Sequence, residues 1–124
     1  MGYYSDFEIY FEKKDLTIKQ QVEILDFLEN DNVLGVITDI IREERDKDSA
    51  YYADKLLPDV VEVYERTWYD FSEDFLRLSK QFPYLKITIE RSGEDRFDAE
   101  RCYFFNGNYQ SSKGEMVFEE NKLW

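Results

Sequence analysis

Two clusters of acidic side chains are the residues of this chain whose type and spacing could support chemistry. They comprise Asp70, Glu73 and Asp74, and Glu94, Asp95 and Asp98. Carboxylate oxygens are the ligands that Mg²⁺ and Ca²⁺ prefer, but neither cluster has the spacing of an EF-hand loop. The first cluster also suits a helix N-terminus, where carboxylates complement the helix dipole, and the second suits an acidic loop. We therefore predict no metal site and no cofactor.

The residues needed for the common catalytic sets are missing. The chain contains no histidine, which excludes triads with an imidazole base, histidine-ligated zinc and histidine proton relays. Cys102 has no histidine to activate it and lies in an aromatic run, where a small buried side chain would fit. The five glycines are isolated and form no phosphate-binding loop. We predict a protein that is not an enzyme, with a metal-dependent activity as the remaining alternative.

The charge balance narrows the class of partner. Sixteen basic and 28 acidic residues give a net charge of −12 at neutral pH. A field of this sign repels DNA, RNA and anionic lipid, whereas a basic protein surface complements it. The charge is equally explained if it only keeps an aromatic-rich domain in solution.

The length and composition indicate one domain in a reducing compartment. A chain of 124 residues with 43% hydrophobic residues is long enough to bury one core. A single cysteine cannot form an internal disulfide, which suits the cytoplasm of a host cell. No apolar run approaches the roughly 18 residues of a membrane span. We expect a single cytoplasmic domain over residues 1–124.

The first half of the chain predicts a strand and a helix. Residues 3–12 alternate between apolar and polar side chains, which is typical of a half-buried strand. Thr17 and Gln20 have the spacing of a capping box, so a helix is predicted over residues 17–29. Its apolar stripe is expected to comprise Ile18, Val22, Leu25 and Leu28.

The next segment is harder to assign. Residues 33–45 fit both a strand and a helix, and the helix is favoured. Residues 42–49 mix both charges without an apolar side chain, as in a solvated helix end and loop. We treat residues 33–59 as an insertion in the fold. Residues 60–68 then alternate again and predict a second strand.

The second half predicts a helix followed by strands. Ser72 is expected to cap a helix that Pro83 ends, with an apolar stripe of Phe75, Leu78 and Phe82. Residues 84–91 alternate and predict a third strand.

The chain ends in further predicted strands. Asn106 and Gly107 form the residue pair that a type I′ hairpin turn requires. A last strand is predicted over residues 116–119. The order of elements predicts an α+β fold of ferredoxin-like type, with an antiparallel sheet of about five strands and two or three helices on one face.

The stretch from Trp68 to Asn108 resembles the YubB-type ferredoxin-like domain of small plasmid and phage proteins. In such domains an aromatic strand end leads into an acidic helix. The matching residues are Thr67 to Asp70, Ser72 to Phe75, Leu78 to Pro83, Gly93 to Asp95, Asp98 and Tyr103 to Gly107. The chain departs from the pattern in the insertion and at Glu100 and Arg101. The resemblance implies a mobile-element origin and carries over no catalytic residue.

These observations lead to a predicted function in binding. We expect an acidic phage or mobile-element protein that inhibits a basic, nucleic-acid-binding host protein, such as a defence nuclease, by imitating the charge of DNA. Tyr51 and Tyr52 are expected to be exposed and would add contact area to a binding surface. They belong to one aromatic set with Tyr64, Trp68 and Tyr69. The predicted partner-binding residues are Glu43, Glu44, Asp46, Asp48, Tyr51, Tyr52, Asp70, Glu73, Asp74, Glu94, Asp95 and Asp98. The alternative is an assembly module or homodimer whose charge matters only for solubility.

Overall fold

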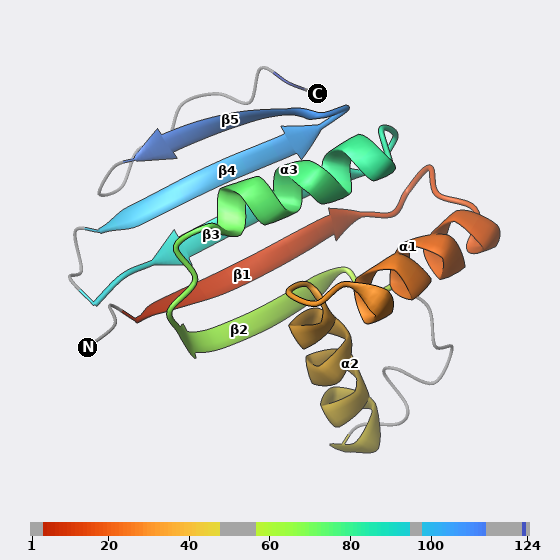
Figure 1. Ribbon diagram of the computed structural model, residues 1–124, viewed down its shortest axis with the longest axis horizontal. Coiled ribbons are helices and arrows are strands. Elements are labelled where there is room, and N and C mark those ends of the chain that lie inside the picture. Colours follow the sequence, from red (N-terminus) through yellow and green to blue (C-terminus); the bar gives the residue numbers. More distant parts are fainter. Residues whose placement is uncertain (1–3, 48–56, 95–97, 114–122, 124) are drawn as a thin grey trace.

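The computed structural model describes residues 4–47, 57–94, 98–113 and 123. These residues form an α+β fold, as predicted (Figure 1). The elements in chain order are β1 (Ser5–Glu12), α1 (Ile18–Asn30), α2 (Gly35–Lys47), β2 (Val60–Arg66), α3 (Phe71–Gln81), β3 (Lys86–Ser92), β4 (Ala99–Phe105) and β5 (Asn108–Lys113). Among the described residues, no helix is both long and apolar enough to cross a membrane.

The five strands form one antiparallel sheet in the order β2-β1-β3-β4-β5. The predicted antiparallel sheet is therefore confirmed. The strand order is not that of a standard ferredoxin-like sheet, because β1 and β2, which flank the two consecutive helices, are direct antiparallel neighbours. The ferredoxin-like part of the prediction is thus not confirmed by the topology.

The helices cover one face of the sheet. Phe7, Ile9 and Phe11 of β1 are buried, whereas the residues between them point to the other side, because successive side chains of a strand face opposite ways. Figure 1 shows α3 lying across the middle strands, with α1 and α2 towards the β1 and β2 side of the sheet. The described part of the chain places no helix on the opposite face, which we call the open face.

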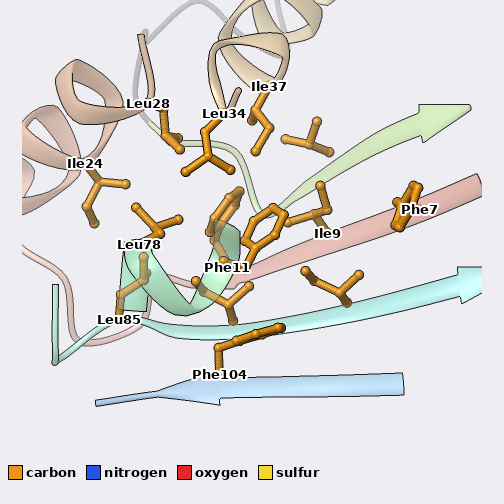
Figure 2. Packing of buried hydrophobic residues seen from close by; sticks show 14 of the residues in the cluster. Phe7, Ile9, Phe11, Ile24, Leu28, Leu34, Ile37, Leu78, Leu85 and Phe104 are labelled. Carbon is orange, nitrogen blue, oxygen red and sulfur yellow. The ribbon is translucent and has the colours of Figure 1, made fainter. Parts of the chain in front are cut away.

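The core lies between the helices and the sheet. Ile24 and Leu28 of α1 converge with Leu34 and Ile37 above the β1 residue Phe11 (Figure 2). The segment expected to be an insertion therefore begins with a helix that belongs to the main core. The preference for a helix over residues 33–45 is confirmed, since α2 covers Gly35–Lys47.

Helix α1 begins as predicted and buries part of its predicted stripe. The Thr17 side chain accepts a hydrogen bond from the Gln20 amide, and the Gln20 side chain accepts one from the Thr17 amide, which completes the capping box. Two of the expected stripe residues are exposed, Ile18 by 67% and Val22 by 43%. Leu28 of the stripe is buried and Leu25 packs against the core, and the helix also buries Gln21 and Ile24, which the stripe did not include.

Helix α3 buries its predicted stripe of Phe75, Leu78 and Phe82, but Ser72 is not its N-cap. The helix begins at Phe71, so that Asp70 occupies the cap position and Ser72 lies within the first turn. The Asp70 backbone carbonyl accepts the first intrahelical hydrogen bond, from the Asp74 amide at 3.0 Å. The predicted N-cap was wrong because the helix already begins at the buried Phe71, one residue before Ser72.

The predicted hairpin joins β4 and β5. Asn106 and Gly107 both adopt positive φ angles, of 53° and 74°, as a type I′ turn requires. The Gly107 amide donates a hydrogen bond of 2.9 Å to the buried Ser79 hydroxyl of α3. The turn is therefore tied to the helix layer. The predicted strand over residues 116–119 lies outside the described residues.

Strand β2 carries a bulge opposite the start of β1. The register between the two strands shifts between Ser5 and Phe7. Glu65 has a φ angle of 52°, which is uncommon for a residue other than glycine. Its amide donates a hydrogen bond of 2.9 Å to Asp6 Oδ1, so the side chain of β1 satisfies a backbone group that the bulge removes from the ladder.

Candidate functional site

Three glutamates from three neighbouring strands form a row on the open face. Glu8 of β1 lies opposite Glu62 of β2 on one side and opposite Glu90 of β3 on the other. Neighbouring strands lie about 4.8 Å apart, so directly opposite side chains are close neighbours. We call Glu62, Glu8 and Glu90 the glutamate row.

A tyrosine accompanies each of the first two glutamates. Tyr10 follows Glu8 by two residues and Tyr64 follows Glu62 by two, so each tyrosine shares a strand and a face with its glutamate. Each hydroxyl donates a hydrogen bond to that glutamate. Because β1 and β2 run antiparallel, the tyrosines lie on opposite sides of the row.

The pKa values of both tyrosines are raised by their acidic surroundings. The pKa of Tyr10 is raised to about 12, first by its hydrogen bond to Glu8, then by burial and by the charges of Glu8, Glu90 and Glu62. The pKa of Tyr64 is likewise raised to about 12, chiefly by its hydrogen bond to Glu62. The three glutamates of the row therefore act together on the pKa of Tyr10, across three strands.

The third glutamate of the row binds a cation from within the chain. Arg101 Nε of β4 lies 3.0 Å from Glu90 Oε1. Burial by itself lowers the pKa of Arg101, but hydrogen bonds with Tyr103 and Glu90 more than offset this effect, so the pKa is raised. Glu8 and Glu62, by contrast, have no hydrogen bond or ion pair with a cationic group in the described part of the chain.

The acidic character continues beside the row. Asp6 lies on the same face, and with Glu65 and Glu94 it lines a hollow of about 400 Å³ at the start of β1. Glu94 Oε1 accepts a hydrogen bond of 3.1 Å from the Tyr4 amide. Among the sequence-predicted residues that the structure describes, Glu94 is thus placed next to the open face.

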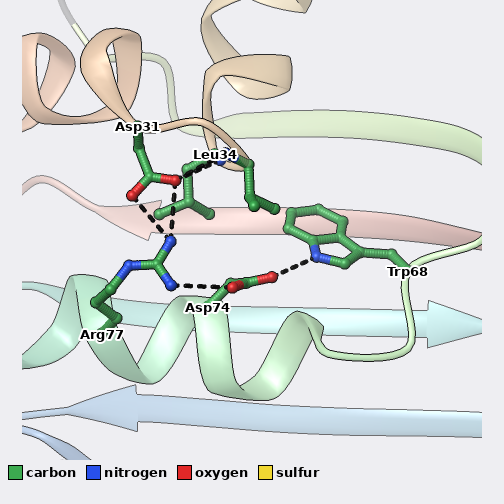
Figure 3. Close-up of polar contacts among 6 residues, drawn as sticks. Asp31, Leu34, Trp68, Asp74 and Arg77 are labelled. Atoms are coloured by element: carbon green, nitrogen blue, oxygen red, sulfur yellow. Dashed lines mark hydrogen bonds and ion pairs between the residues drawn. The ribbon is translucent and has the colours of Figure 1, made fainter.

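Asp74, by contrast, is buried and bonds other side chains of the fold. Its carboxylate accepts hydrogen bonds from Trp68 Nε1 at 2.7 Å and from Arg77 Nη1 at 3.0 Å. Arg77 also bonds Asp31, with Nη2 lying 2.8 Å from Oδ2 (Figure 3). Asp31 Oδ1 accepts hydrogen bonds from the Val33 and Leu34 amides at 2.9 Å. This network fixes the turn between α1 and α2 to α3, and only 8% of Asp74 is exposed.

Asp98 is also held inside the chain. Arg91 Nη2 lies 2.7 Å from Asp98 Oδ1, and Arg91 Nε lies 3.1 Å from Glu100 Oε2. The hydrogen bond to Asp98 is the largest cause of the raised pKa of Arg91; burial opposes it, and the bond to Glu100 adds to it. Arg91 and Glu100 face the helix layer, since they share the side of Ile89. The two carboxylates therefore have different partners, since Glu94 bonds the Tyr4 amide, although the Gly93 amide donates a hydrogen bond of 2.7 Å to the Asp98 carbonyl.

The remaining predicted residues are distributed over the helix layer or lie outside the described residues. Asp70 and Glu73 are exposed at the start of α3, and Glu43 is exposed on α2. Glu44 and Asp46 belong to α2, whereas Asp48, Tyr51, Tyr52 and Asp95 lie outside the described residues. No group of three or more metal-ligating side chains that could hold an ion occurs within the described ranges.

Two further hollows lie on the helix side. The larger, of about 480 Å³, is lined by the turn between α1 and α2 and includes Arg42, which is ion-paired with Glu29 and Asp39. The smaller, of about 240 Å³, lies beside Trp68 and the paired Arg91. Because these arginines are already bonded to carboxylates, neither hollow offers the uncompensated charge that the open face does.

Sequence reasoning missed the glutamate row. Its members are far apart in the chain and only the strand register brings them together. The available signal was the outward half of each alternating pattern, since Glu8, Glu62 and Glu90 each fall between two inward apolar residues or beside one. Tyr64 had been singled out as a contact residue, but without its partner Glu62.

Comparisons with protein-family models, curated proteins and solved structures give no match to this chain. The resemblance to YubB-type domains therefore stays a prediction.

Proposed function

We propose that this chain is a stoichiometric binding protein whose open acidic face docks on a basic, nucleic-acid-binding protein and blocks it by charge mimicry. The observation that carries the proposal is the glutamate row, in which Glu62, Glu8 and Glu90 lie opposite one another on three adjacent strands. Carboxylates spaced over a rigid sheet attract a basic cleft and speed its encounter.

The row supports a binding role because it works against folding. Like charges directly opposite on neighbouring strands destabilise a sheet, and sites that violate such local rules are often functional. Two exposed tyrosines at the row, Tyr10 and Tyr64, add the kind of side chain that is enriched in protein interfaces. A charge that served only solubility would not need to be concentrated in this way.

The biological setting of the proposal comes from the sequence. The resemblance to YubB-type ferredoxin-like domains supports a phage or mobile-element protein that acts in the cytoplasm of a host cell. A defence nuclease is the expected class of partner, because it has a basic cleft and its inhibition would benefit the phage or mobile element. The proposed action needs no catalysis and no cofactor.

The test compares two variants with the same change in net charge. The row variant carries Glu8→Gln, Glu62→Gln and Glu90→Gln. The control variant carries Asp15→Asn, Glu23→Gln and Asp26→Asn, three exposed positions in α1 and the turn before it. The partner is identified by cross-linking in the producing cell and mass spectrometry, and is then purified.

Binding is measured with purified components by calorimetry, with duplex DNA as competitor. We expect the wild type and the control variant to displace DNA from the partner at a one-to-one ratio, and the row variant to lose this ability. A partner that binds the row variant as tightly as the wild type, or that holds DNA and the chain together, contradicts the proposal. Light scattering distinguishes a homodimer that forms through another surface.

A further inference from the structure

One guanidinium group of the chain itself is bound on the open face. Arg101 donates to Glu90 from the neighbouring strand, with Nε 3.0 Å from Oε1, and it is hydrogen-bonded to Tyr103. The arginine is therefore held by one glutamate and one tyrosine. This arrangement lies at the β4 end of the glutamate row.

The same two side-chain types occur twice more along the row. Glu8 is bonded by Tyr10, and Glu62 is bonded by Tyr64. Neither glutamate is bonded to an arginine or lysine in the described part of the chain. Each pair thus offers a carboxylate and a tyrosine, the two side-chain types that Arg101 contacts, and neither pair is bonded to a cation from within these residues.

We infer that Glu8 with Tyr10 and Glu62 with Tyr64 are two receptor sites for arginine side chains of the partner, and that they select arginine over lysine. This inference rests on the proposed function and names the residues that the partner must present. We call the two pairs the glutamate–tyrosine sites.

The preference for arginine follows from the chemistry of the two cations. A guanidinium is planar, so it can stack on a tyrosine ring while its forked N–H groups bond a carboxylate. The lysine ammonium is compact and strongly hydrated, and it gains less from such a site. Tyr10 is 36% and Tyr64 59% exposed, which leaves ring surface for a partner.

The sites are prepared before the partner arrives. Each tyrosine hydroxyl already bonds its glutamate, so two side chains that would lose freedom on binding are partly ordered in the free protein. Glu8 and Glu62 lie directly opposite each other on neighbouring strands, which are about 4.8 Å apart, so nearby arginines of one segment can occupy both sites.

The test uses two peptides of equal length and charge, one of oligo-arginine and one of oligo-lysine. Their affinities for the full chain are measured by fluorescence anisotropy at physiological salt. We expect the arginine peptide to bind roughly ten-fold more tightly, from about three-fold at each tyrosine. In the double variant Tyr10→Val, Tyr64→Val the two peptides should bind with about equal affinity, because valine keeps strand propensity but removes the ring.

A conservative variant separates recognition from folding. Tyr10→Phe with Tyr64→Phe keeps both rings, so it should retain most of the preference for arginine, and circular dichroism verifies that all variants are folded. Equal affinity of the wild type for both peptides, or an unchanged preference in the valine variant, overturns the inference.

Failure of the inference can be told apart from failure of the proposed function. If both peptides bind the wild type equally but lose affinity for the row variant and not for the control variant, only the selection of arginine is wrong. If neither peptide distinguishes the row variant from the control variant, the open face is not the cation-binding surface, and both proposals fail.

Discussion

Glu8 and Glu62 lie directly opposite each other on antiparallel strands of the open face, and each is bonded by a tyrosine of its own strand. Glu8 also faces Glu90 across the next strand. The middle glutamate of the row therefore has a like charge on both sides, which makes it the point where the proposed binding role and the stability of the sheet conflict most directly.

Neutralising the middle glutamate should stabilise the fold. Glu8→Gln removes two like-charge contacts while leaving an acceptor for the Tyr10 hydroxyl, so we expect the free energy of unfolding to rise by about 0.2–1 kcal/mol at low salt. Added salt should reduce the gain by screening. Urea denaturation at two salt concentrations measures it, with Asp26→Asn as a control for an exposed carboxylate outside the row. A destabilised Glu8→Gln variant would show that the row does not strain the sheet.

Two neighbouring carboxylates of α3 should differ sharply in how much they contribute to the free energy of unfolding. Asp74→Ala leaves the Trp68 indole without its acceptor and removes one partner of Arg77, so we expect a loss of about 2–3 kcal/mol in the free energy of unfolding. Glu73→Ala changes an exposed side chain and should cost less than about 0.5 kcal/mol. Thermal denaturation monitored by Trp fluorescence compares the two. Similar losses at both positions would contradict a structural role specific to Asp74.

Asp31 should give the protein a stability that acid removes. Burial alone would raise the pKa of this carboxyl, but hydrogen bonds from the Leu34 and Val33 amides and from Arg77 lower it. The carboxylate therefore stabilises the fold above the unfolded pKa of about 4, and this contribution is lost as the pH falls through the lower folded pKa.

The matching variant is Asp31→Asn. At neutral pH we expect it to lower the free energy of unfolding by about 1–2 kcal/mol. Denaturant titrations at a series of pH values should show the gap between wild type and variant closing below pH 4. Asp39→Asn, at an exposed position of α2, serves as the control. A gap that does not change with pH would mean that the charge of Asp31 is not what stabilises the turn.

Cys102 should react only when the protein unfolds. Its side chain is fully buried in β4, and its sulfur lies 3.5 Å from Glu100 Oε1. Both burial and the nearby carboxylate disfavour a reactive thiolate. An aromatic disulfide reagent should therefore label the native protein at least about a hundred-fold more slowly than the denatured protein. Rapid labelling of the native state would indicate an exposed thiol.

Local patterns predicted most elements because they depend on residues close in sequence. The capping box at Thr17 and the turn at Asn106 and Gly107 are set by short-range hydrogen bonds and backbone angles. The buried side of β1 followed from alternation alone. The α1 stripe was predicted only in part, because Leu28 is buried and Leu25 packs against the core whereas Ile18 and Val22 are exposed, a difference that helical spacing alone does not reveal.

The candidate site could not be predicted in the same way. Glu8, Glu62 and Glu90 become neighbours only through the strand order and register, and no local pattern specifies either. The acidic clusters that are conspicuous in sequence turned out to have mixed roles, since Asp74 binds Trp68 in the interior. Sequence spacing identified acidic residues, but their surroundings in the fold decide which of them stay exposed and unpaired with a cation.

The bulge at Glu65 has a consequence for how molecules of this protein meet one another. β2 is an outer strand of the described sheet, and a regular outer strand can accept the edge of a second molecule and begin a growing fibre. The left-handed residue and the locally increased twist interrupt the row of amides that such growth would copy. The bulge therefore disfavours edge-to-edge pairing of two molecules along this end of β2.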